Sequence, residues 1–248
     1  MSDSVLPLFI LEQKGAVWQP IEFVGTGFIL GAPEREHDVL ITCWHCVNHT
    51  ISANQIYGGL LQGENGDPHT VIFLNSLEQD INGTDLACAI PIGAPKSPWR
   101  LGLKPTGTGN QVRSYGYPHT LGVRLSNGQK YFDLQERYLE GYVVREFGYK
   151  NFDSKIIPSY ELDMLTPNGL SGGPIFDRMT GNVTGVVYGQ HSVGSIVEEA
   201  WFDAETGERH PELQRLLHFG LAHWLPTLHK MQGSATGNLP LATFSPPE

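Results

Sequence analysis

Cysteine is scarce in this chain of 248 residues. The three cysteines, Cys43, Cys46 and Cys88, are too few and too odd in number for a disulfide framework, so the fold must depend on its hydrophobic core. A long hydrophobic run is also missing, since no stretch approaches the roughly 18 apolar residues that span a bilayer. The short apolar run 5–11 follows Asp3 and lacks the basic segment of a signal peptide. We therefore expect a cytoplasmic protein that does not associate with membranes.

Positive charge is in deficit as well. Lys and Arg number 16 against 26 Asp and Glu, which gives a formal net charge of −10 and a pI near 5.4. A protein that binds the phosphate backbone without sequence preference needs a basic surface, so we expect no nucleic acid partner.

Glycine and proline are plentiful, with 29 and 17 copies, and hydrophobic residues make up 40% of the chain. This composition is typical of a turn-rich β-protein. Short extended runs separated by turn residues are predicted in two groups, at 5–11, 27–30, 39–42, 71–74 and 86–92, and at 111–115, 138–145, 160–165, 173–176 and 183–188. The sequence RMTGN before the last run predicts a hairpin. Two similar β-halves follow from this pattern.

A proline- and glycine-rich connector over 93–110 separates the two halves. Near the end, Leu213, Leu216, Leu217, Leu221 and Trp224 lie at helical spacing, which predicts a helix over 211–231. The last segment, 232–248, is rich in Gly, Pro and Ser and is expected to be disordered.

The segment NGLSGGPIFD, at 168–177, carries the strongest chemical signal. A serine followed by two glycines and a proline predicts a bare, tight turn around an exposed hydroxyl. Gly169 and Gly172 permit positive φ there, and the amides of Gly169 and Ser171 could converge as an oxyanion-stabilising pair. A glycine-rich hairpin without chemistry would explain this motif if it stood alone.

A serine nucleophile needs a base, and the base needs an orienting group. His45 follows the apolar run 39–42, and Asp85 immediately precedes the run 86–92. An acidic group at the entrance to a buried strand is costly without a partner, and a histidine N–H is a suitable one. Taken singly, His45 could be a packing residue and Asp85 a turn residue.

In their order and spacing, the three segments resemble the chymotrypsin-like, or trypsin-like, serine peptidase family. The resemblance covers roughly residues 25–190, with the matching pieces GTGFIL, TCWHCV, TDLACAI, GYP, GLSGGPIFD and TGVVYG. It implies two six-stranded antiparallel Greek-key β-barrels packed together: 1–100 with His45 and Asp85, and 101–210 with Ser171. The helix 211–231 and the disordered tail 232–248 would follow the second barrel.

The resemblance also implies the roles of these residues in a serine endopeptidase. Ser171 would attack a peptide carbonyl of a protein or peptide substrate, His45 would move the proton and Asp85 would orient His45. The amides of Gly169 and Ser171 would form the oxyanion hole, and no metal or organic cofactor would be needed.

The chain departs from the family pattern near the specificity pocket. Leu165 stands at the position of the pocket floor, which favours an uncharged apolar substrate side chain over Arg or Lys. Val187, Tyr188 and Gly189 would form a strip that pairs with an extended substrate. Asp163 would reopen a preference for Arg or Lys if the loop register differs by two, and His191 nearby also leaves the preference open.

Three other interpretations remain. Cys43, Cys46 and His49 have C-x2-C-x2-H spacing, but a zinc site would need a fourth ligand, so we expect no metal. The chain could be a binding module that keeps the fold without turnover. It could also be a proteolytic effector that becomes active only with a regulatory partner protein or a ligand.

Overall fold

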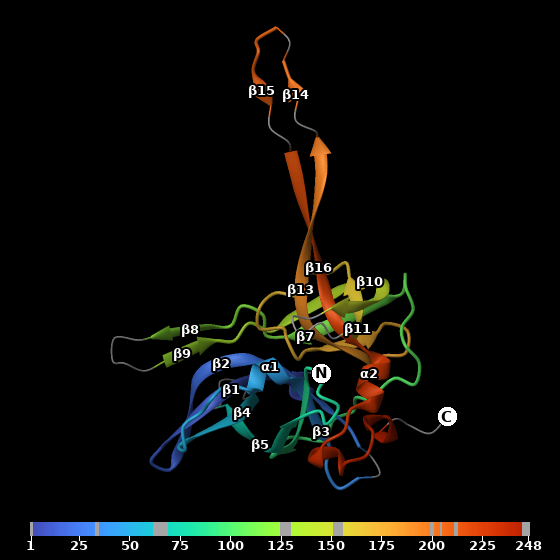
Figure 1. Cartoon of the computed structure of the whole chain (residues 1–248). Coiled ribbons are helices and arrows are strands. Elements are labelled where there is room, and N and C mark those ends of the chain that lie inside the picture. Colours follow the sequence, from blue (N-terminus) through green and yellow to red (C-terminus); the bar gives the residue numbers. More distant parts are fainter. Residues whose placement is uncertain are drawn as a thin grey trace.

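The computed structural model describes residues 2–32, 35–61, 69–124, 130–150, 156–198, 201–203, 205–210 and 213–244. Six antiparallel strands close the first barrel in the order β1-β2-β3-β6-β5-β4 (Figure 1). They are β1 (Val5–Lys14), β2 (Val17–Leu30), β3 (Val39–Cys43), β4 (Gln55–Leu61), β5 (Thr70–Gln79) and β6 (Leu86–Ile92). Most of β1 and all of β3 are buried, because these strands pack within the core of this barrel.

The second barrel also has six strands, in the order β10-β11-β16-β13-β12-β7. They are β7 (Gln111–Gly116), β10 (Arg137–Lys150), β11 (Ile156–Leu162), β12 (Pro174–Asp177), β13 (Val183–Glu198) and β16 (Leu213–Trp224). β12 and β13 form the hairpin predicted from RMTGN. The predicted fold class, two six-stranded antiparallel β-barrels, is therefore confirmed.

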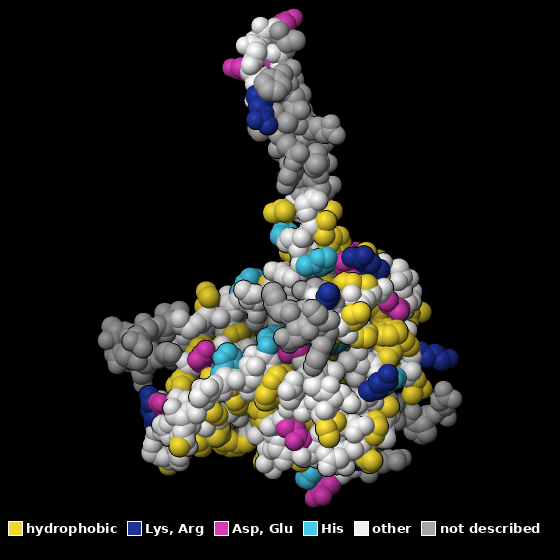
Figure 2. Space-filling model, in the orientation of Figure 1, with side chains coloured by type: hydrophobic (Ala, Val, Ile, Leu, Met, Phe, Trp, Pro, Cys, Tyr) yellow, Lys and Arg dark blue, Asp and Glu magenta, His cyan; other side chains and the backbone are white. Residues whose placement is uncertain are grey.

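Two pairs of short strands lie outside the barrels. The first pair is β8 (Leu121–Arg124) with β9 (Lys130–Asp133), and the second is β14 (Trp201–Phe202) with β15 (Arg209–His210). β13 and β16 extend beyond the second barrel as a two-stranded arm, and β14 and β15 lie at its far end (Figure 1). Val193, Leu216 and Leu217 on this arm are exposed. Figure 2 shows apolar side chains at the foot of the arm, with charged side chains scattered over the body.

The helix predicted over 211–231 is wrong for most of its length. Residues 213–224 form strand β16, and only α2 (Leu225–Lys230) is helical. Spacing of i, i+3 and i+4 favoured a helix, but hydrogen bonding to β13 along the whole of β16 overrides that local preference. The other short helices are η1 (Ser2–Ser4), α1 (Trp44–Val47), η3 (Ser234–Thr236) and η4 (Leu241–Phe244). No described helix has the length and apolar character that crossing a membrane requires.

The prediction of a disordered tail is also wrong for residues 232–244; residues 245–248 lie outside the described part. Met231, Leu241 and Phe244 are buried in the core that includes the first barrel. The Arg35 guanidinium lies 4.2 Å from the centre of the Phe244 ring. A few apolar anchors therefore order a segment whose composition predicted disorder.

Asp80 joins this C-terminal segment to the loop that leads to Asp85. Its buried carboxylate accepts hydrogen bonds from the Gln232 N–H at 3.0 Å and from the Thr84 hydroxyl at 2.7 Å. The Ile81 N–H in turn donates to the Gln232 carbonyl at 3.1 Å. The end of the chain thus braces residues 80–85 from outside the first barrel.

An Asp80→Ala variant should lose about 1–2 kcal/mol of unfolding free energy, because it leaves partly buried donors without an acceptor. Its C-terminal segment should also be cut faster in limited proteolysis. Asp133→Ala is the matched control, since Asp133 is exposed and its carboxylate accepts a bond from the neighbouring Gln135. Equal stability and equal cleavage rates in the two variants would contradict this bracing role.

Candidate active site

His45 lies at the point where the buried strand β3 gives way to the single helical turn α1. Its Nδ1 lies 2.7 Å from Asp85 Oδ2, and its backbone N–H donates to Asp85 Oδ1 at 2.9 Å. The Trp44 N–H donates to the Asp85 carbonyl at 3.1 Å. Three contacts therefore fix the imidazole relative to Asp85. Because Nδ1 is bonded to Asp85, Nε2 is the ring nitrogen that takes up a proton.

Asp85 immediately precedes β6, as predicted. Because β6 pairs with β3, residue Leu86 lies opposite Cys43, and Asp85 is brought to the start of α1. The Asp85 side chain is 27% exposed and that of His45 46%, so the pair lies at the surface with one side open.

The turn around Ser171 has the conformation that the sequence predicted. Gly169 has φ +94° and Gly172 has φ +87°. The Gly172 N–H donates to the Val187 carbonyl and the Gly173 N–H to the Leu170 carbonyl, both at 2.8 Å. Within the described residues, the N–H groups of Gly169 and Ser171 have no hydrogen-bond partner. Two unpaired amides thus flank Leu170, and their convergence as an oxyanion-binding pair stays a prediction.

Thr26 of β2 docks this turn onto the first barrel. Its N–H donates to the Ser171 carbonyl at 2.9 Å, and its hydroxyl donates to the Gly169 carbonyl at 2.7 Å. Its own carbonyl accepts the Thr42 hydroxyl at 2.7 Å. The segment GTGFIL was recognised as one that matches the family, but this role of Thr26 was not predicted. A fully buried threonine between two glycines has no feature in the sequence that indicates such a role.

The Ser171 turn and the His45 helix meet at the junction between the barrels. The Cys46 thiol lies 3.7 Å from the Ser171 carbonyl oxygen, one residue away from His45. The Ser171 hydroxyl, however, donates to the Tyr188 carbonyl at 3.5 Å, and the described structure gives it no bond to His45. The structure thus pairs His45 with Asp85 and brings Ser171 beside them, while contact between the hydroxyl and the imidazole stays a prediction.

The environment shifts the pKa of His45 upward. Burial lowers the pKa, but hydrogen bonds to Asp85 and Cys46 outweigh it and raise the value from 6.5 to about 10. The His45 imidazole therefore stays protonated near neutral pH. Burial, reinforced by the Asp85 carboxylate, raises the pKa of the neighbouring Cys43 thiol, which keeps that thiol protonated.

His223 of β16 is a nearby residue that sequence reasoning missed, because it fell within the predicted helix. It is fully buried, and its Nε2 lies 4.0 Å from Asp85 Oδ2. Burial lowers its pKa from 6.5 to about 4, against the opposing effect of the Asp85 carboxylate. The ring is therefore neutral in the folded protein at physiological pH.

Acidification should destabilise the protein through His223. Between pH 6.5 and about 4 the unfolded chain binds a proton that the folded chain excludes, so the unfolding free energy should fall by about 3 kcal/mol as pH falls through that window. Denaturant unfolding of wild type and His223→Gln at several pH values measures this, and the variant should lose the slope. Parallel curves for the two proteins would contradict it. The raised pKa of His45 has the opposite effect on the pH dependence of stability. Its contribution to the unfolding free energy is fully present below pH 6.5 and is lost as pH rises through about 10.

The residues expected to bind substrate differ in their surroundings. Val187 is fully buried, and its backbone N–H and carbonyl are both bonded to the Gly172–Gly173 segment, so they serve the barrel rather than a substrate. Tyr188 and Gly189 follow it at a β-bulge, and the Gly189 carbonyl accepts the Thr166 hydroxyl. Leu165 is 54% exposed.

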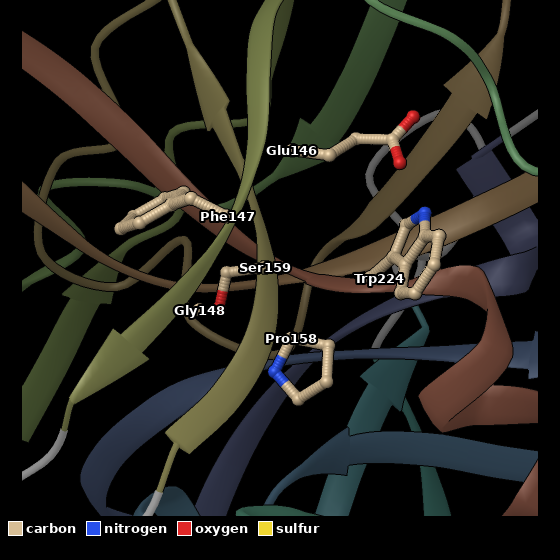
Figure 3. A pocket seen from close by; sticks show the side chains of 6 residues that line it. All are labelled: Glu146, Phe147, Gly148, Pro158, Ser159 and Trp224. Atoms are coloured by element: carbon tan, nitrogen blue, oxygen red, sulfur yellow. The ribbon is translucent and has the colours of Figure 1, made fainter.

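A hollow of about 280 Å³ lies on the second barrel and adjoins Tyr188 through Ser159, whose hydroxyl is 2.9 Å from the Tyr188 hydroxyl. It is lined by Glu146, Phe147, Gly148, Pro158, Ser159 and Trp224 (Figure 3). None of the predicted catalytic or substrate-binding residues lines it.

Among the described residues, the group of side chains close enough to share a metal ion is Cys43, His45 and Asp85, rather than the C-x2-C-x2-H motif. All three thiols are free and buried.

Comparison with known proteins identifies the fold and the family. The sequence profile of the trypsin-like peptidase domain matches residues 25–186. The active form of the Rv3671c protease from M. tuberculosis superposes with a TM-score of 0.52 and 18% identity, covering 100% of this chain and 83% of that one. The HtrA-type protease AlgW with a decapeptide superposes with a TM-score of 0.52 and 14% identity, covering 91% and 62%.

Identities this low show the fold alone, and a search among curated protein sequences finds no match. The profile match supplies the family, since it spans well over half of the chain and includes the segments around His45, Asp85 and Ser171. The chain therefore belongs to the trypsin-like peptidase family.

Proposed function

We propose that the protein is a serine endopeptidase that uses Ser171, His45 and Asp85. The observation that carries the proposal is the docking of the Ser171 turn, with its two unpaired amides, beside the His45–Asp85 pair. In this proposal, Ser171 is the nucleophile, His45 the base with Asp85 as its orienting group, and the two amides the oxyanion site at one junction between the barrels.

In this reaction, Ser171 Oγ attacks the scissile carbonyl while Nε2 of the neutral His45 imidazole takes its proton. Because the pKa of His45 is raised to about 10, this neutral form becomes more abundant as pH rises above 7. The Ser171 hydroxyl must first leave the Tyr188 carbonyl, a rotation about a single side-chain bond. His45 then gives the proton to the leaving amine, and water releases the acyl group from Ser171 by the same proton route. Asp85 holds the Nδ1 proton and stabilises the imidazolium.

The N–H groups of Gly169 and Ser171 stabilise the negative charge on the substrate oxygen. One such donor contributes about 3–4 kcal/mol to lowering the barrier. The positive φ of Gly169 and the bond from Thr26 to its carbonyl hold the peptide in place before substrate arrives. No metal or organic cofactor enters this mechanism.

For specificity, we propose a preference for an uncharged apolar side chain before the scissile bond. The Leu165 side chain at the expected pocket floor offers no counter-charge to a basic substrate group. Glu161, the nearby buried carboxylate, is already bound by Arg145 at 2.8 Å and by His191 at 2.8 Å. Tyr188 and Gly189 are the members of the expected strip that we retain for contact with an extended substrate.

A peptide library incubated with wild type and with Ser171→Ala tests this function. We expect the wild type to cleave, with apolar residues enriched before the cut, and the variant to leave the library intact although it folds with the same Tm. Cleavage at the same sites by both proteins would show that Ser171 is not the nucleophile.

One observation favours a second candidate, a peptidase that requires a regulatory partner or ligand. The Ser171 hydroxyl bonds to the Tyr188 carbonyl instead of His45, which is the arrangement of a resting site. Cleavage that begins only after a partner is added would support this candidate over the constitutive enzyme.

The free thiols are compatible with the cytoplasmic location that we proposed from the cysteine content.

A further inference from the structure

His223 reaches Asp85 from a different barrel than His45 does. Asp85 and His45 belong to the first barrel, whereas His223 lies on β16 of the second. His223 Nε2 lies 4.0 Å from Asp85 Oδ2, the same oxygen that His45 Nδ1 approaches to 2.7 Å. Within the described residues, both ring nitrogens of this fully buried histidine lack a hydrogen-bond partner.

The surroundings of His223 hold its ring in place. Its ring centre lies 4.6 Å from that of Tyr188, whose hydroxyl is 2.9 Å from the Ser159 hydroxyl. On the sheet, His223 pairs with Ser159 of β11 and with Val186 of β13. The charged or titratable groups that act on it are Asp85, His45 and Asp80. Asp85 is the residue that offers this nitrogen an acceptor, through its carboxylate and through its backbone carbonyl.

We propose that His223 is a positioning residue that holds the Asp85 carboxylate through an N–H donated from the second barrel. This inference rests on the proposed peptidase function. A distance of 4.0 Å is longer than a hydrogen bond, so the His223 ring and the Asp85 carboxylate must shift about 1 Å closer to form the contact. Unpaired buried nitrogens favour that shift, because a buried donor without an acceptor is costly.

A neutral donor suits this role. Because burial keeps His223 uncharged, its N–H constrains the carboxylate without placing a second positive charge beside the imidazolium that forms on His45. The contact also links the His45–Asp85 pair of the first barrel to the second barrel, which carries Ser171. His223 would therefore affect how well the three reacting groups align, rather than how substrate binds.

Two variants separate this role from simple packing. His223→Phe keeps a ring against Tyr188 but removes the N–H, whereas His223→Gln keeps a donor. We expect His223→Phe to lower kcat, and the rate of Ser171 labelling by a fluorophosphonate, about tenfold with KM unchanged. His223→Gln should recover to within about threefold of wild type. His37→Phe is the control, since His37 is exposed and pairs with Glu36.

Equal rates in His223→Phe and wild type, or no recovery in His223→Gln, would overturn the proposal. A second measurement needs no activity: the low-field proton NMR signal of the His45 Nδ1–H should shift in His223→Phe and keep its wild-type position in His37→Phe. An unshifted signal, or its absence from wild type, would overturn the proposal. If wild type fails to label but the signal shifts, the peptidase function fails while the contact between His223 and Asp85 stands.

Discussion

Replacement of Asp85 by asparagine should lower kcat for peptide cleavage roughly 10⁴-fold. The carboxylate accepts both the ring and the backbone N–H of His45, and an amide in its place presents a donor that favours the wrong tautomer of the imidazole. Without the carboxylate, the pKa of His45 should also fall from about 10 towards 6.5. The residual activity of the variant should therefore reach its plateau at lower pH than that of wild type.

Steady-state kinetics from pH 6 to 10 measures both effects. Asp133→Asn serves as the matched control, because it makes the same chemical change at an exposed position. Circular dichroism and Tm should show that Asp85→Asn remains folded. A kcat within tenfold of wild type would mean that Asp85 does not orient the base.

Replacement of Gly172 by alanine should damage both the fold and the site. At φ +87° an L side chain is strained, and a Cβ at this position would lie 2.0 Å from the Thr26 carbonyl oxygen and 2.3 Å from the Thr42 hydroxyl. Neither neighbour can retreat, because both belong to buried strands of the first barrel. We expect a loss of roughly 3 kcal/mol in unfolding free energy and at least a hundredfold loss of kcat/KM, since the Ser171 turn must move.

Gly181→Ala separates these effects from those of positive φ alone. Gly181 has φ +72° but no atom within 4 Å of its added Cβ, so this change should cost only about 1 kcal/mol and leave kcat/KM unchanged. Denaturant unfolding and peptide kinetics of the two variants provide the comparison. Similar losses in both would show that the fit of the turn against Thr26 has no importance.

The strands around the site were predictable because local pattern and burial agree there. Residues 86–92 form β6 with the bounds that the apolar run predicted, and this places Asp85 at its start. The turn at Ser171 was predictable for a similar reason, since glycine at 169 and 172 indicates the positive φ that both residues adopt.

Other elements depend on contacts that no local pattern shows. Strand β4 was missed because Gly58 and Gly59 suggest a turn, whereas they allow Leu11 and Leu6 of β1 to pack closely against the strand. The leucines of β16 have helical spacing, yet the strand is determined by its partner β13. Thr26 and His223 become recognisable as site residues only when the barrels are placed together.

The most direct test of the catalytic proposal is mass spectrometry of the protein after reaction with a fluorophosphonate between pH 7 and 10. A single adduct should map to Ser171, form faster as pH rises towards the pKa of His45, and be absent from Ser171→Ala. A folded wild-type protein that stays unmodified throughout this range, or that carries the adduct on another residue, would contradict the catalytic assignment.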